Sequence, residues 1–263
     1  HFPLNPEALE AARRRLAFEE LLLYQVALSL LRGGAEKGVK LDFPDEEIGN
    51  FWKLLGFPAT AAQKRVLYEM AGDLRRDAPM ARLLQGDVGS GKTAVAFGAI
   101  YLSWKSGRQA AMMAPTEVLA QQHFAGARAL FEPLGMRVGL LTGSLSKKQH
   151  AAAHAAIASG EWDAVLGTHA LITETVEYSD LGLVITDEQH RFGVRQRSVF
   201  GKKGGRPNVL VMSATPIPRT LSLILYGDLD LSILDELPPG RTPIRTRVVP
   251  EEKRKDMYGF VRQ

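Results

Sequence analysis

The stretch GDVGSGKT, residues 86–93, decides what kind of fold this chain adopts. It satisfies the phosphate-binding pattern G-x-x-x-x-G-K-[ST] through Gly86, Gly91, Lys92 and Thr93. The strand-like run RLLQ precedes it, and the helix-like run TAVAFGAIYLSW begins at its last residue. A strand, a glycine-rich loop and a helix in that order are the context that this motif requires. The sequence therefore predicts a P-loop that binds a nucleoside triphosphate.

The residues of this loop have distinct expected roles. Gly89 and Gly91 let the backbone wrap closely round a pyrophosphate, whose charge meets successive N–H groups and the positive end of the following helix. Lys92 is expected to reach the β- and γ-phosphates, and Thr93 is expected to ligate Mg²⁺. The predicted nucleotide-binding residues are Gly86, Asp87, Val88, Gly89, Ser90, Gly91, Lys92 and Thr93.

Short apolar runs alternate with longer helical segments from residue 80 to residue 235. The runs are RLLQ, AAMMAP, VGLLTG, AVLGT, LGLVIT and VLVMSAT. Their nearly continuous apolar character is typical of strands buried on both faces, which predicts an α/β fold with a mostly parallel central sheet flanked by helices. Polar signatures follow directly after the runs, at the strand ends where such sheets bind their ligands.

Two acidic residues follow the run LGLVIT, namely Asp187 and Glu188. A buried strand would deliver both to the sheet edge, where Asp187 can hold Mg²⁺ through water and Glu188 can orient or deprotonate the attacking water. Together with Lys92 they form the predicted catalytic set. The alternative interpretation is a solvated turn.

The N-terminal part predicts a helix outside the sheet. Residues 5–34 begin with a capping Asn5 and a first-turn Pro6 and end at a glycine pair, as one long helix does. Four leucines recur every seven residues along it, at Leu9, Leu16, Leu23 and Leu30. This stripe favours a helix laid against a neighbouring domain over a short coiled coil. The charged, Gly- and Pro-containing stretch that follows predicts a linker and a boundary near residue 52.

The C-terminal part predicts a connector. DELPPGRTPI, residues 235–244, has a stiff Pro-Pro-Gly composition; RTRVVP then favours a new strand, and a helix is expected to begin at Pro250. We therefore expect a helical linker segment at 1–52, an ATP-binding unit at 53–236, and a connector with the start of a second unit at 237–263. The sequence is expected to be a piece of a longer protein.

Composition narrows the setting in which the protein works. Its 263 residues include no cysteine, which excludes a disulfide framework and a thiolate metal site. The longest apolar run, LLLYQVALSLL, is shorter than the ~20 residues that cross a bilayer, and the first ten residues lack a secretory pattern. We expect a cytoplasmic protein with no membrane partner. The net charge of +4 is compatible with a nucleic-acid partner without deciding it.

An ordered set of motifs resembles the first motor lobe of superfamily 2 helicases and translocases, a RecA-like domain. The set comprises Gln63, GDVGSGKT, APTE (114–117), TGS (142–144), GTHA (167–170), DEQH (187–190) and SATPIPRT (213–220). DEQHRFGVRQR, SATPIPRT and DELPPGRTPI resemble the RecG family of bacterial DNA helicases in particular. EAARRRLAFEELLLYQ is similar to the segment that joins the junction-binding wedge domain of that family to its motor. Transcription-repair coupling translocases, which share RFGVRQR and GTHALI, are the alternative family.

The resemblance implies an ATP-dependent motor on double-stranded DNA that remodels stalled replication forks and Holliday junctions by branch migration. ATP and Mg²⁺ would be its cofactors, and Gln63 would contact the adenine. The residues implied to grip the DNA backbone, or to couple it to the γ-phosphate, are Pro115, Thr116, Gly143, Ser144, Thr168, His169, His190, Ser213 and Thr215. The implied partner is branched DNA, the implied state is a monomer, and the wedge domain and second motor lobe would lie outside this sequence.

Two interpretations from other functional classes stay open. The chain could be a nucleotide-responsive module that switches its grip on nucleic acid without hydrolysis, although such a switch needs no water-orienting acid at Glu188. It could also be a docking unit built on the leucine-striped helix. For the motor interpretation we expect slow turnover by this chain alone, because a second lobe usually supplies the arginine that stabilises the transition state.

Overall fold

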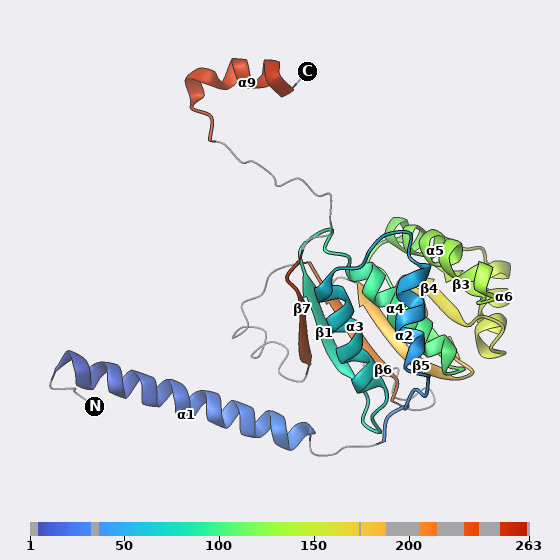
Figure 1. The fold of residues 1–263 in the computed structure, drawn as a ribbon, viewed down its shortest axis with the longest axis horizontal. Helices are drawn as coiled ribbons and strands as arrows, with labels where there is room; N and C mark the ends of the chain where they lie inside the picture. Colours follow the sequence, from blue (N-terminus) through green and yellow to red (C-terminus); the bar gives the residue numbers. More distant parts are fainter. Residues whose placement is uncertain are drawn as a thin grey trace.

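The computed structural model describes residues 5–32, 37–173, 175–187, 206–214, 229–236 and 248–261. Within these residues, seven strands form one sheet between layers of helices (Figure 1). Three predicted site residues lie outside the described residues: Glu188, His190 and Thr215. Residues 237–247, which hold most of the predicted connector, lie outside them as well.

The strands are β1 (Ala81–Gly86), β2 (Gln109–Met113), β3 (Val138–Leu141), β4 (Ala164–Gly167), β5 (Leu181–Asp187), β6 (Asn208–Ser213) and β7 (Asp230–Leu234). Their order in the sheet is β3-β4-β2-β5-β6-β1-β7, and every pairing is parallel. The predicted parallel sheet is thus confirmed, and each predicted apolar run forms one strand. The edge strand β7 was missed because its exposed and buried residues are mixed instead of forming a continuous apolar run.

The helices around the sheet are α2 (Glu46–Leu54), α3 (Ala61–Leu74), α4 (Lys92–Lys105), α5 (Glu117–Phe131) and α6 (Lys147–Ala158). Two short 3₁₀ helices, η1 (Glu132–Leu134) and η2 (His169–Ile172), follow α5 and β4. In Figure 1, α2, α3 and α4 lie together over one face of the sheet. Helix α6 packs on the opposite face, so the sheet is covered on both sides.

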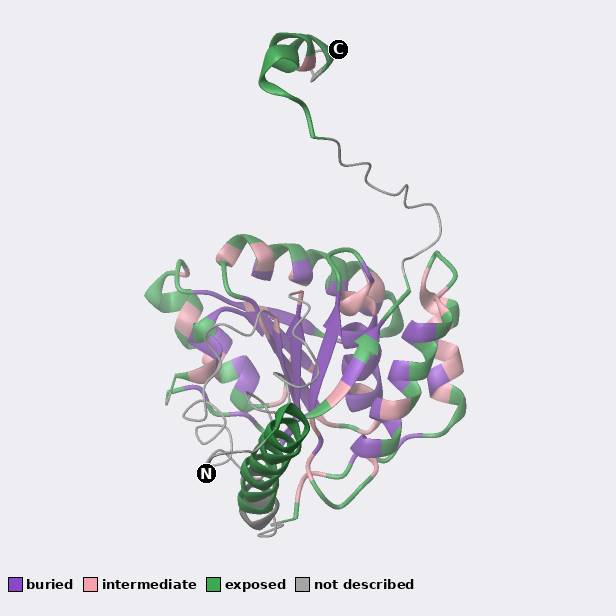
Figure 2. Cartoon of the chain, turned by 90° about the vertical axis from the view of Figure 1, so that its left-hand side faces the viewer, coloured by how far each residue is buried: buried purple, intermediate pink, exposed green. Residues whose placement is uncertain are grey.

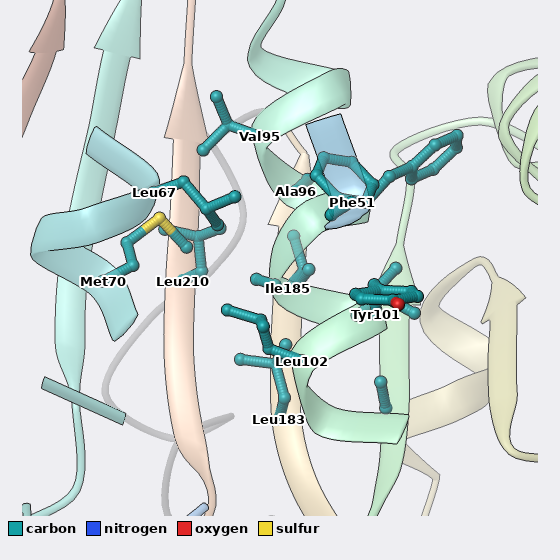
Figure 3. Packing of buried hydrophobic residues seen from close by; sticks show 14 of the residues in the cluster. Phe51, Leu67, Met70, Val95, Ala96, Tyr101, Leu102, Leu183, Ile185 and Leu210 are labelled. Carbon is teal, nitrogen blue, oxygen red and sulfur yellow. The ribbon is translucent and has the colours of Figure 1, made fainter. Parts of the chain in front are cut away.

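Neighbouring residues of the central strands enter two separate cores. Leu183 and Ile185 of β5 face the core beneath α2, α3 and α4, where Figure 3 shows them among residues of those helices. Val184, between them, belongs to the core on the other face. Alternate side chains of a strand point to opposite faces, so burial of both faces requires every position to be apolar. This requirement explains the continuous apolar runs in the sequence.

The stretch after the N-terminal helix is part of the first core. Four of its side chains are buried there: Leu41, Phe43, Ile48 and Phe51. The linker expected in this stretch is therefore wrong from residue 41 onward, because its few apolar side chains all find a place in the core despite the charged composition around them. We propose that the ATP-binding unit begins near residue 37 instead of residue 53.

Helix α2 is also tied to α4 by polar contacts. The Tyr101 hydroxyl donates to Glu47 Oε2 at 2.5 Å, and Lys105 Nζ lies 3.2 Å from Glu47 Oε1. Burial alone would raise the pKa of the Glu47 carboxyl, but the hydrogen bonds from Tyr101 and Lys105 outweigh it and lower that pKa. The aromatic rings of Phe51 and Tyr101 lie 5.7 Å apart at the same contact.

Two predicted helices lie outside the sheet unit. Helix α1 (Pro6–Arg32) begins as expected, with the Ala8 N–H donating to Asn5 Oδ1 at 2.7 Å. Its described side chains are exposed, as the green helix in Figure 2 shows, and they include Leu9, Leu16 and Leu23 of the stripe. The predicted C-terminal helix is confirmed as η4 (Glu251–Lys253) followed by α9 (Arg254–Val261), whereas residues 248–250 of the predicted strand RTRVVP form no strand.

Among the described residues, no helix is long and apolar enough to cross a membrane.

Replacing Phe51 with alanine tests whether residues 41–51 belong to the fold of the sheet unit. Phe51 is fully buried, so Phe51→Ala is expected to lower the free energy of unfolding by about 3–5 kcal/mol. The matched variant Phe18→Ala removes an exposed ring from α1 and is expected to change it by less than about 0.5 kcal/mol. Chemical denaturation followed by circular dichroism measures both, and equal effects would show that this stretch is separate.

Candidate nucleotide site and nucleic-acid edge

The carboxyl ends of the strands bring the predicted nucleotide residues together. β1 ends at Gly86, where the P-loop begins, and β5 ends at Asp187. Strand β6 lies between them, with Met212 beside Asp187 and Ser213 beside Gln85. Because all these pairings are parallel, the P-loop, Ser213 and Asp187 share one edge of the sheet.

The P-loop has the backbone that its sequence predicts. Gly89 and Gly91 adopt positive φ angles of 78° and 87°, a conformation that favours glycine. Gly91 is the N-cap of α4, and no side chain forms a capping hydrogen bond at this N-terminus. The first-turn N–H groups of a helix carry its partial positive charge, so this end of α4 suits the negative charge of a phosphate.

Ser90 gives a further indication that the loop fits a phosphate. Its N–H donates to the carbonyl of Asp87 at 3.1 Å, which tightens the loop. Its hydroxyl is buried and has no hydrogen-bond partner in the described part of the chain. A Cβ at Gly86 would come within 2.5 Å of that hydroxyl and 3.0 Å of Leu234 Cβ, so a larger residue there would force Ser90 to move. An unsatisfied buried hydroxyl is costly, and a bound phosphate oxygen would satisfy it.

Lys92 and Thr93 occupy the first turn of α4. The Lys92 ammonium donates to the carbonyl oxygens of Gly86 at 2.7 Å and of Asp87 at 2.9 Å. It therefore lies against the loop that would hold the β- and γ-phosphates. Thr93 follows directly and is half-buried.

Gln63, predicted to contact adenine, braces the P-loop in this structure. It lies in the first turn of α3, where its Oε1 accepts the Thr60 N–H at 3.0 Å in a capping box. Its Nε2 donates to the carbonyl of Ser90 at 2.9 Å, and the residue is only 1% exposed. The adenine contact stays a prediction. The sequence analysis missed the second role of Gln63, which is to hold the Ser90 carbonyl of the P-loop.

The same turn of α3 anchors the start of the predicted connector. The Ala62 N–H donates to Glu236 Oε2 at 3.1 Å, and Arg65 donates to Asp235 Oδ1 at 3.0 Å. Arg65 also donates to the carbonyl of Ile233 at 3.0 Å. These partners lie about 170 residues apart in the sequence, where no local pattern could reveal them. The first residues after β7 are thus held one residue away from Gln63.

Asp187 has a partner that the sequence analysis missed. His123 Nε2 of α5 lies 2.7 Å from Asp187 Oδ2, and their side chains are only 9% and 16% exposed. Because an ionised carboxylate only accepts hydrogen bonds, the imidazole N–H is the donor. The one local signal for His123 was its position two helical turns beyond Thr116 in APTE.

The residues predicted to grip DNA gather along the other half of the same edge. Pro115 and Thr116 follow β2, Gly143 and Ser144 follow β3, and Thr168 and His169 follow β4. These three strands are neighbours in the order β3-β4-β2, so the structure brings the six residues to adjacent strand ends. All but Thr168 are exposed. Thr168 is 3% exposed and its hydroxyl lacks a partner in the described part, so its predicted DNA contact requires movement.

Hydrogen bonds connect these strand ends to one another. Thr116 Oγ1 accepts the Leu119 N–H at 3.3 Å and so caps α5. Glu117, in the first turn of that helix, accepts the Ser144 N–H at 2.9 Å. Helix α5 therefore fixes the loops after β2 and β3 relative to each other.

The family model of DEAD/DEAH box helicases matches residues 60–224 of this chain. This match spans well over half of the sequence and includes both halves of the carboxyl edge. The chain belongs to the DEAD/DEAH box helicase family.

Its similar relatives are more specific. The ATP-dependent DNA helicase RecG of Synechocystis sp. is 48% identical over 266 residues, covering 100% of this chain and 32% of the relative. RecG of Bacillus subtilis is 47% identical over 264 residues, covering 99% of this chain and 39% of the relative. A solved structure of RecG bound to a three-way DNA junction matches with a TM-score of 0.88 and 43% identity, covering 100% of this chain and 36% of that one.

These comparisons confirm the resemblance to the first motor lobe of RecG-type helicases. They also confirm the RecA-like class of the fold. The chain spans about a third of the length of the curated relatives it matches.

Lys92→Ala is expected to weaken the binding of a fluorescent ATP analogue about 10- to 100-fold, the loss of one charge-assisted contact to phosphate. The matched variant Lys148→Ala removes an exposed lysine from α6 and is expected to leave the affinity unchanged. Fluorescence titration of this chain measures both. Equal affinities for Lys92→Ala and the wild type would rule out the predicted phosphate site.

Gly91→Ala tests the contact between Gln63 and the loop. A larger residue at position 91 must keep the positive φ of Gly91, and its Cβ would lie 2.1 Å from Gln63 Nε2. At Gly107, where φ is also positive, no atom would lie within 4 Å. We expect Gly107→Ala to cost about 1–2 kcal/mol of folding free energy and to preserve nucleotide binding. Gly91→Ala should cost more and weaken the binding about tenfold or further. Denaturation measures the folding free energy and titration the nucleotide affinity. Equal values of both for Gly91→Ala and Gly107→Ala would mean that Gln63 does not brace the loop.

Proposed function

We propose that the protein containing this chain is an ATP-dependent motor on double-stranded DNA, which remodels stalled forks and Holliday junctions by branch migration. One observation carries the proposal. The predicted nucleotide residues and the predicted DNA-binding residues occupy adjacent halves of one sheet edge, and β5 with Asp187 directly neighbours β2 with Pro115 and Thr116. Because these strand ends are neighbours, a structural change at bound ATP can be transmitted to bound DNA over a short distance.

In this proposal, the P-loop binds the phosphates of ATP through its N–H groups and the positive end of α4, and Lys92 reaches the β- and γ-phosphates. Thr93 and Asp187 would hold Mg²⁺, which neutralises charge on the transferred phosphoryl group when bound. Glu188 orients or deprotonates the attacking water. Gln63, which is buried against Ser90, would contact the adenine after a movement of its side chain.

The DNA contacts in this proposal are made without reading bases. Exposed loop N–H groups and small hydroxyl side chains at strand ends suit the sugar-phosphate backbone. Pro115, Thr116, Gly143, Ser144, Thr168 and His169 provide that surface, and His190, Ser213 and Thr215 couple it to the γ-phosphate. The solved RecG structure bound to a three-way DNA junction supports branched DNA as the partner.

The whole protein would need parts beyond this chain. A second motor lobe would close on the nucleotide and provide an arginine, which is worth about 10³ to 10⁵ in rate in related motors. A wedge domain would read the branch. We propose that the protein acts as a monomer on the chromosome in the bacterial cytoplasm, and that this chain alone turns over ATP slowly.

The deciding experiment measures ATP turnover by the full-length protein with and without branched DNA, for the wild type and Glu188→Gln. We expect DNA to stimulate the wild type, and Glu188→Gln to lower turnover by about 10²-fold or more while nucleotide binding persists. Unchanged nucleotide-dependent DNA binding together with no hydrolysis in the wild type would favour the non-catalytic switch instead. Vigorous DNA-stimulated turnover by the isolated chain would show that the chain completes its own active site.

A further inference from the structure

We propose that His123 is a positioning residue, which fixes Asp187 for Mg²⁺ and couples that carboxylate to the DNA edge through α5. This inference rests on the proposed function, because it assigns Mg²⁺ to Asp187 and DNA to the edge. It adds a residue and a physical route that the motifs quoted in the sequence analysis do not include.

The first step is the bond itself. His123 Nε2 and Asp187 Oδ2 are 2.7 Å apart, and both side chains are largely buried. A hydrogen bond to an ionised partner is stronger than a neutral one, and low exposure limits competition from water. The bond engages Oδ2 and so restricts the rotation of the carboxylate that would hold Mg²⁺.

The second step is the helix that carries His123. Helix α5 begins directly after Thr116, and His123 lies seven residues further along, about 10 Å at 1.5 Å per residue. The first turn of α5 contains Glu117, which accepts the Ser144 N–H at 2.9 Å. A shift of the loops after β2 or β3 would therefore move the N-terminus of α5, and the helix would carry that shift to Asp187.

The third step is the other end of the helix, where one face is buried. Phe131 of α5 is fully buried, and its ring lies 5.7 Å from the ring of Phe97 in α4. A side chain at Gly126 would lie 3.5 Å from Phe97, an ordinary van der Waals contact, so the two helices touch through this ring. Because α4 carries the P-loop at its N-terminus, α5 contacts both the phosphate-binding helix and the Mg²⁺ carboxylate. One helix thus connects the loops after β2 and β3 to Asp187 and to α4.

The test uses the full-length protein with His123→Ala and His123→Gln, and His150→Ala on α6 as the matched control. The first readout is the Mg²⁺ concentration that gives half-maximal binding of a fluorescent ATP analogue. We expect His123→Ala to raise it about tenfold or more, as removal of a residue that orients a metal ligand does, while binding in EDTA stays unchanged. His123→Gln, whose amide nitrogen can replace Nε2, should restore most of the wild-type value.

The second readout is the ratio of ATP turnover with DNA to turnover without it. His123→Ala is expected to lower this ratio as well as turnover itself, whereas His150→Ala preserves both. A wild-type Mg²⁺ requirement and a wild-type ratio in His123→Ala would overturn the proposal. If His123→Ala fails to fold, as thermal unfolding would show, His123→Asn and His123→Gln decide: a raised Mg²⁺ requirement that only Gln restores supports the proposal, and equal wild-type values overturn it.

Failure of the proposed function would look different. Wild-type protein without DNA-stimulated turnover would overturn the motor and the coupling through α5, whatever His123 does. The Mg²⁺ titration of nucleotide binding would still decide whether His123 positions Asp187.

Discussion

Parallel pairing of the seven described strands places all their carboxyl ends at one edge, and the chemistry of this chain depends on that constraint. A parallel strand must be followed by a crossover, and the ends of β1, β2 and β3 each pass through a loop into a helix, α4, α5 and α6. The polar residues after six different strands therefore meet on one line. Buried apolar side chains on both faces of the sheet fix the strands side by side, so the loops at their carboxyl ends lie next to one another.

The P-loop illustrates how much support such a site requires. Its two positive-φ glycines give it a shape that is costly for other residues, and its carbonyl at Ser90 is held by Gln63 from a different helix. The capping box at Thr60 fixes Gln63 in turn, and Ala62 and Arg65 on either side of Gln63 hold Glu236 and Asp235. The phosphate loop, α3 and the start of the connector are thus joined by a short series of hydrogen bonds. A site that must hold a charged ligand gains from such preorganisation.

The carboxyl edge of the sheet is divided between predicted nucleotide residues and predicted DNA-binding residues. This division is the basis for the proposal that the chain is one lobe of a motor. The predicted phosphate and Mg²⁺ residues use the ends of β1 and β5, the predicted coupling residue Ser213 uses the end of β6, and the other DNA candidates use the ends of β2, β4 and β3. Helix α5 packs on β3 and β4, is capped by Thr116 at its start and lies beside Phe97 of α4 near its end. His123 contacts Asp187 from the middle of that helix. Membership of the DEAD/DEAH box helicase family agrees with this arrangement.

The sequence by itself determined the class of fold, six of the strands and the P-loop, because each depends on residues that are neighbours in the chain. Continuous apolar runs specify buried strands, and a glycine-rich loop between a strand and a helix specifies a phosphate site. It did not determine β7, the burial of Leu41 and Phe51, or the partner of Asp187. Those features depend on which segments meet in space, and segments far apart in sequence are brought together only when the cores on both faces of the sheet close.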